Sequence, residues 1–132
     1  MGDPVISMLV EIKNAYLAKK PFIEVSNTRS RERLGKFLAS HGYVKNHRSF
    51  KKGRFSYLHI DLLDDEVAGL YHFRSLRILS KPGRRIYFPV PKLSRLLTKG
   101  RRHIILSTSK GIMRIDEARK RKLGGEAVCD LG

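Results

Sequence analysis

The chain has 132 residues, enough for one compact domain or two small lobes that share a core. A hydrophobic fraction of 41% indicates a folded protein, and a formal net charge of +16 favours a polyanionic partner. No apolar run approaches the roughly 20 residues that span a bilayer, the N-terminus lacks a signal-peptide pattern, and the single cysteine, Cys129, excludes an intramolecular disulfide and a multi-cysteine zinc site. We therefore expect a soluble intracellular protein with no membrane contact and no cofactor.

The positive charge is concentrated in the second half of the chain. Residues 1–66 carry 12 basic and 8 acidic side chains, whereas residues 67–132 carry 16 basic and only 4 acidic ones. Between Glu66 and Asp116 there is no acidic residue. A solvated surface normally mixes both signs, so this half has the charge pattern of a phosphate-binding surface.

The first half predicts an α-β-α-β-β lobe over residues 1–66. A helix begins at Asp3-Pro4, because an acidic N-cap precedes proline at the first helical position, and its apolar stripe includes Ile12 and Tyr16. A strand over 22–25 and a helix over about 30–41 follow. Strands over 43–47 and 55–62 flank a basic turn at 51–53, and residues 64–66 form a solvated turn.

The second half predicts a lobe over residues 67–132 that is mainly β with short helices. Strands are expected over 70–79 and 84–88, around a turn at 80–83 in which proline and glycine stand in type II order. A short helix over 91–97, a strand over 103–106, a last helix over 116–123 and a strand over 126–131 complete the lobe. The fold class is therefore α+β with two small lobes.

One short stretch carries the strongest chemical signal, the run Ser107-Thr108-Ser109-Lys110-Gly111. Hydroxyl groups can donate to phosphate or bond to 2′-hydroxyls and base edges, Lys110 adds a phosphate-binding charge, and Gly111 permits close backbone approach. An ordinary serine-rich turn is the alternative reading. The letters also spell the Ser-x-x-Lys motif of serine hydrolases, but the accompanying Ser-Asp-Asn and Lys-Thr-Gly elements do not occur.

Basic and aromatic residues interleave in the stretch from Arg84 to Phe88. Its rings could stack on an unpaired base, although alternation in a strand predicts that either Tyr87 or Phe88 faces the core. The five histidines are scattered without ligand spacing, so the sequence gives little support to an enzyme or a metal site.

Four blocks of residues resemble a known family, the eighth protein of the small ribosomal subunit in its bacterial and organellar form. They are Asp3 to Leu9 with Ile12-Lys13-Asn14, Ser80-Lys81-Pro82-Gly83 with Arg85-Ile86-Tyr87, Ser107 to Met113, and Ala118-Arg119 with Leu123-Gly124-Gly125-Glu126. The blocks keep the order and spacing of the family across almost the whole chain.

The resemblance implies a two-lobed α+β ribosomal protein, without catalysis or a small-molecule substrate, that binds the central domain of small-subunit ribosomal RNA early in assembly. It also implies neighbouring small-subunit proteins as partners, in a bacterial cytoplasm or an organelle. A free-standing RNA-binding regulator of translation is the alternative function. The RNA-binding positions that the resemblance implies are Ser107, Thr108, Ser109, Lys110 and Gly111 in the loop, Glu126 as the residue that orients the loop, Tyr87, Arg85 and Lys81, and Lys13 and Asn14 on the first helix.

Three residues depart from the family pattern. Arg114 replaces a helix-capping serine or threonine, which predicts that the cap shifts to Asp116. Arg102 stands where relatives carry a glycine, and Asp130 where an aromatic residue is common. The first two departures add or keep positive charge, so we expect the RNA-binding surface to be extended.

Overall fold

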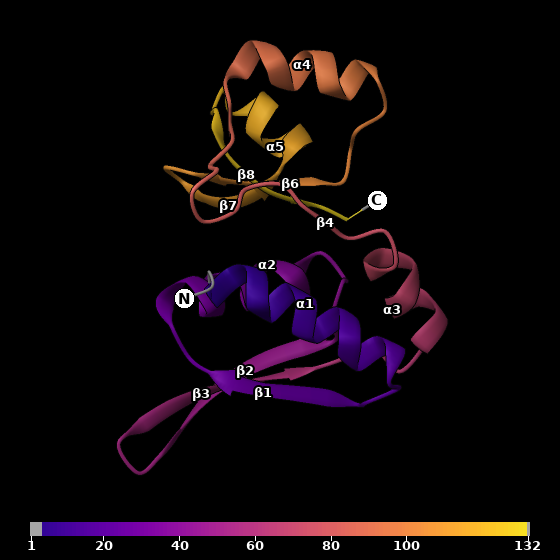
Figure 1. Ribbon diagram of the computed structural model, residues 1–132, viewed down its shortest axis with the longest axis vertical. Coiled ribbons are helices and arrows are strands. Elements are labelled where there is room, and N and C mark those ends of the chain that lie inside the picture. The colour runs from indigo at the N-terminus through magenta and orange to yellow at the C-terminus, as the bar shows by residue number, and fades with distance from the viewer. Residues whose placement is uncertain (1–3, 132) are drawn as a thin grey trace. The chain divides into compact units, whose positions relative to one another are not determined.

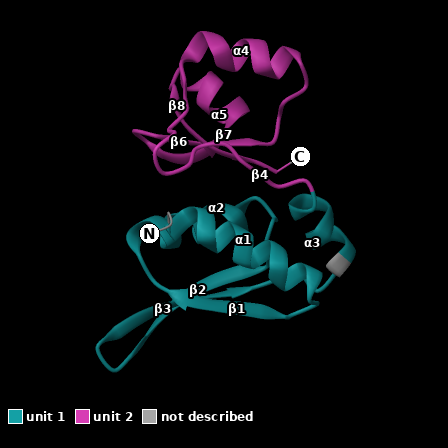
Figure 2. Ribbon diagram, viewed as in Figure 1, with its two compact units in different colours: residues 1–74 teal, residues 75–132 magenta. Residues whose placement is uncertain are grey.

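The computed structural model describes residues 4–131, apart from the side chain of Glu66, and divides the chain into two compact units. Unit 1 comprises residues 1–74 and unit 2 comprises residues 75–132 (Figure 2). The boundary follows Arg74 and not residue 66, because residues 66–73 form a helix that packs within unit 1. Both units combine helices with antiparallel sheets, which confirms the α+β class.

Unit 1 is a three-stranded sheet with helices over one face (Figure 1). Its elements are α1 (Pro4–Leu17), β1 (Phe22–Ser26), α2 (Arg29–Ser40), β2 (Asn46–Lys52), β3 (Phe55–Asp61) and α3 (Glu66–Phe73). The strands run antiparallel in the order β1-β3-β2. The predicted α-β-α-β-β order is confirmed, and the expected apolar stripe of α1 supplies the buried side chains of Met8, Leu9, Ile12 and Tyr16. The predicted cap at Asp3 lies outside the described residues.

Helix α3 corrects the strand predicted over residues 70–79. The carboxylate of Asp65 accepts the backbone N–H groups of Val67 and Ala68 at 3.0 and 3.3 Å, so the expected solvated turn is a helix N-cap. Gly69 lets the helix approach α1, because a Cβ there would collide with the Tyr16 ring. The apolar positions interrupted by Arg74 and Arg77 suggested a strand, but this packing requires a helix, and β4 is limited to Arg77–Ile78.

The strand predicted over 43–47 also begins later, at Asn46. The backbone N–H groups of Tyr43 and Val44 bond to the Leu38 carbonyl at the end of α2, so these two buried residues close the helix. β2 instead continues to Lys52, which pairs with Phe55 across a tight turn.

Unit 2 is a five-stranded sheet with two helices. Its elements are β4 (Arg77–Ile78), β5 (Tyr87–Phe88), α4 (Val90–Thr98), β6 (Ile104–Thr108), β7 (Gly111–Arg114), α5 (Ile115–Lys120) and β8 (Gly125–Asp130). The order is β4-β8-β6-β7, and β5 also pairs with β8. The strand expected over 84–88 is reduced to two residues, and β7 was not predicted. The core is apolar and consists of Phe88, Leu93, Ile104, Leu106, Met113, Ile115, Ala118 and Ala127.

The structure shows the surroundings of two of the three residues that depart from the family pattern, Asp130 and Arg114. Asp130, only 5% exposed, receives Arg77 Nη2 at 3.2 Å and Arg101 Nη1 at 3.5 Å, so a buried carboxylate is compensated by two guanidinium groups. α5 begins after Arg114 without a side-chain cap, whereas Asp116, inside the helix, accepts the Glu117 N–H at 3.0 Å. The predicted shift of the N-cap position to Asp116 is therefore wrong.

Candidate nucleic-acid interface

Strand pairing in unit 2 brings three of the predicted site residues into one row. Glu126 on β8 lies opposite Tyr87 on β5 and opposite Ser107 on β6. Residues directly opposite in a ladder project from the same face of a sheet. The neighbouring pair of Leu106 and Ala127 belongs to the buried core, so the row lies on the other face. Of the alternatives for β5, Phe88 is buried and Tyr87 is 65% exposed.

The row depends on two consecutive glycines at the start of β8. A Cβ at Gly125 would lie 2.6 Å from the Ser107 carbonyl oxygen, and one at Gly124 would lie 2.9 Å from the Phe88 carbonyl oxygen. Real Cβ atoms essentially never come this close to backbone atoms. The glycine pair therefore allows β8 to reach β5 and β6 together.

The predicted hydroxyl loop is the tight turn between β6 and β7. Thr108 Oγ1 donates to the Gly111 carbonyl at 2.8 Å and accepts the Lys110 N–H at 3.2 Å, so this hydroxyl holds the turn. Gly111 has φ 112° with open space around its Cβ position, which makes backbone conformation the reason for glycine there. Ser107, Ser109 and Lys110 are exposed. Among the described residues the two serine hydroxyls have no hydrogen-bond partner.

Arg85, which precedes β5, forms an ion pair with the row through Glu126. Its Nη1 lies 3.0 Å from Glu126 Oε1, and both side chains are partly exposed. The resemblance implies that Glu126 orients the loop. The Glu126 backbone pairs with Ser107, whereas its carboxylate accepts from Arg85 and leaves its second oxygen as a further acceptor.

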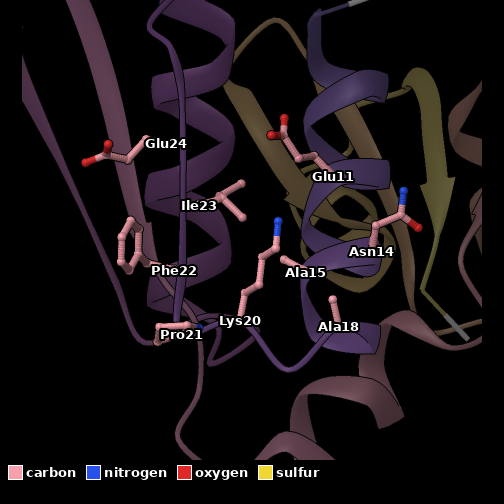
Figure 3. Close-up of a pocket in the computed structure, with 9 residues that line it drawn as sticks. All are labelled: Glu11, Asn14, Ala15, Ala18, Lys20, Pro21, Phe22, Ile23 and Glu24. Atoms are coloured by element: carbon pink, nitrogen blue, oxygen red, sulfur yellow. The ribbon is translucent and has the colours of Figure 1, made fainter.

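The remaining predicted residues lie outside the row. Lys81 occupies an exposed turn in unit 2, where Gly83 at φ 82° fits the predicted type II geometry. Lys13 and Asn14 belong to α1 of unit 1. Asn14 borders a hollow between α1 and β1 (Figure 3). That hollow mixes two carboxylates with the ammonium group of Lys20, so its charge does not favour phosphate.

The glycine pair is the part of the site whose role the sequence reasoning did not assign. Gly124 and Gly125 contributed to the family resemblance, but they were not counted among the functional positions. A glycine at the start of a strand often marks close approach of another backbone, and this signal was available in the sequence. The partners in that approach, β5 and β6, could not be identified without the fold.

Metal-ligand clusters and membrane-spanning helices are both absent from the part of the chain that the structure describes. No three His, Cys, Asp or Glu side chains within residues 4–131 are placed to hold a metal ion. None of the described helices has the length and apolar character needed to cross a membrane.

Comparison with known proteins agrees with the family resemblance. The family model for ribosomal protein S8 matches residues 3–131. Proteins named small ribosomal subunit protein uS8c are 39% identical over 127 residues in Gnetum parvifolium and 36% in Welwitschia mirabilis, each covering 96% of this chain and 97% of the relative. The uS8 protein of the bacterium Caldanaerobacter subterraneus is 36% identical over 134 residues, covering 98% of this chain and 96% of the relative. The chain belongs to the ribosomal protein S8 family.

Proposed function

We propose that this chain is a structural, non-enzymatic protein of the small ribosomal subunit that binds ribosomal RNA through unit 2. The family match and the names of its relatives support residence in the small subunit. The row of Tyr87, Glu126 and Ser107 carries the assignment of the surface, because three strands bring a ring, a carboxylate and a free hydroxyl together beside a basic turn.

The chemistry of this surface suits an irregular RNA helix. Lys110 and Arg85 supply charge for phosphates, and the exposed Tyr87 ring can stack on an unpaired base. The hydroxyls of Ser107 and Ser109 can bond to 2′-hydroxyls or base edges. Thr108 has a different role, since its hydroxyl maintains the turn that presents the two serines.

We further propose that the target is the central domain of small-subunit ribosomal RNA, bound early in assembly, with neighbouring subunit proteins as additional partners. Lys13 and Asn14 are proposed as a contact from unit 1, and Lys81 as one from the exposed turn. These finer assignments rest on the family resemblance of the residues quoted above. Sedimentation of cell lysate through sucrose tests ribosome residence, because a free-standing regulator would remain near the top of the gradient.

The binding test compares cognate central-domain RNA with random RNA of the same length. Replacing Ser107 and Ser109 with alanine should reduce the discrimination by about 1–3 kcal/mol, the range for hydrogen bonds whose partner is left unsatisfied. Ser75→Ala, another exposed serine of unit 2, is the matched control. Lys110→Ala should lower the slope of log affinity against log salt by about 0.7–0.9. Unchanged discrimination in the double variant would show that the loop does not read the RNA.

A further inference from the structure

The sheet of unit 1 has one face that no described element of residues 4–74 covers. Figure 1 shows α1 and α2 on the opposite face, where Leu58 and Ile60 of β3 are buried. The alternate residues of β3 therefore project from the uncovered face, together with the β1 and β2 residues paired with them. We call this surface the open face.

Aromatic rings form two stacked pairs on the open face. Phe50 and Tyr57, directly opposite each other on β2 and β3, have ring centroids 5.6 Å apart at 24°. Phe22 stacks on the His59 ring at 4.7 Å and 25°. Phe55, on the same face beyond Tyr57, is 63% exposed. Phe22 is 43% exposed, whereas Phe50 and Tyr57 are half-buried, so the exposed rings at the two ends provide flat surfaces for stacking.

The charge around these rings is positive at one end of the face. Residues 45–60 contain five Lys or Arg and no Asp or Glu. Arg48 lies opposite His59 and Lys52 lies opposite Phe55, so both project from the open face. The acidic groups of the face, Glu24 and Asp61, bond to the two nitrogens of His59 at 2.9 and 2.8 Å. Glu24 and Arg48 both lie opposite His59, so the part of the face without acidic groups is the hairpin end that carries Phe50, Tyr57, Lys52 and Phe55.

We propose that the open face binds a single-stranded RNA segment, with bases stacked on Phe55 and on the Phe50–Tyr57 pair and phosphates held by Lys52 and Arg48. Bases expose their faces only where RNA is unpaired, and stacking tolerates any base. This contact rests on the proposed RNA-binding function and adds a second site with a different mode of recognition.

The chain contains no tryptophan, which allows a local probe of this face. Phe55→Trp introduces a single tryptophan at an exposed position of the full-length protein, and its emission, excited selectively over that of the tyrosines, is measured while an unlabelled oligouridine of about 12 nucleotides is added. Base stacking should quench the emission. The matched probe is Tyr71→Trp, because Tyr71 is 78% exposed and lies on α3, away from the open face. That probe should show no quenching.

Further variants in the Phe55→Trp protein separate stacking from general electrostatic attraction. Phe50→Leu keeps an apolar side chain and should weaken the quenching affinity about 5- to 150-fold, with an unchanged salt slope. Lys52→Ala should instead lower the salt slope by about 0.7. Circular dichroism establishes that each variant is folded.

Three outcomes would overturn the proposal: no quenching at position 55, equal quenching of the Tyr71→Trp probe, or quenching that depends on protein concentration without RNA, which would indicate a second copy of the chain. The serine-loop assay is independent of this result. Loss of discrimination in the serine variants without quenching at position 55 would reject the open face alone. Quenching with unchanged discrimination would reject the loop alone.

Discussion

Replacement of Gly125 by alanine tests whether close approach of β8 to β6 builds the site. The backbone at Gly125 lies outside the left-handed region, so alanine is conformationally allowed there. If space were available, the substitution would stabilise the protein by about 0.4–1 kcal/mol, because alanine restricts the unfolded chain. The structure instead places the new Cβ 2.6 Å from the Ser107 carbonyl oxygen and 2.9 Å from Thr108 Cγ2. A strand must then shift, and overpacking of this kind costs about 1–3 kcal/mol.

The two contributions to the free energy of unfolding have opposite signs, so urea unfolding followed by circular dichroism decides which one is larger. We expect a net loss of about 1–2 kcal/mol for Gly125→Ala, taken from those two ranges. Gly35→Ala in α2 is the matched control, because its Cβ would meet side-chain atoms at an ordinary 3.5–3.7 Å, and it should be neutral or stabilising. A Gly125→Ala protein as stable as the parent would refute the reasoning about strand approach.

Three further predictions concern buried groups. Tyr16→Phe should cost about 1–3 kcal/mol in the same unfolding assay, because the hydroxyl donates to one backbone carbonyl at 2.9 Å and accepts one backbone N–H at 3.1 Å; an unchanged midpoint would contradict this. Burial raises the pKa of the Cys129 thiol to about 12, so maleimide should label Cys129 only in denaturant, and rapid labelling of the native protein would disprove its burial. Hydrogen bonds that the protonated ring donates to Glu24 first, and then to Asp61, raise the pKa of His59 above its usual value despite the opposing effects of desolvation and Arg48. The stability from this cluster is therefore fully present below about pH 6.5, the unfolded value, and is lost as pH rises through the folded pKa. Glu24→Gln should lower the pKa of His59 in an NMR titration, and a pKa that stays raised would show that Glu24 is not its main cause.

The elements that the sequence predicted well are those defined by local signals. The helical stripe ending at Tyr16 and the alternation in β1 appear in the structure as expected. Errors occurred where a distant partner decides the conformation. Residues 70–79 have the apolar positions of a strand, but Gly69 packs against the Tyr16 ring and Asp65 caps a helix there. The strand starting at Asn46 likewise depends on how the end of α2 is closed.

The candidate site was predicted as a set of residues but not as a surface. The hydroxyl run selected Ser107, and the family resemblance added Tyr87 and Glu126; strand register then placed the three in one row. Sequence reasoning treated the hydroxyls of the loop as equivalent, whereas Thr108 holds the turn. It also left the rings of unit 1 unassigned, because their common face exists only once β1, β2 and β3 are paired.

The charge surplus, the periodic helices and the basic, acid-poor second half follow from the sequence by itself, because composition and short-range spacing need no tertiary contact. Tertiary structure alone decides which polar groups meet. Arg85 and Glu126 are 41 residues apart in the sequence, and Glu24 and His59 are 35 residues apart. Both contacts depend on strand register. Register is set by which residues each sheet buries, and that choice is made by the core as a whole.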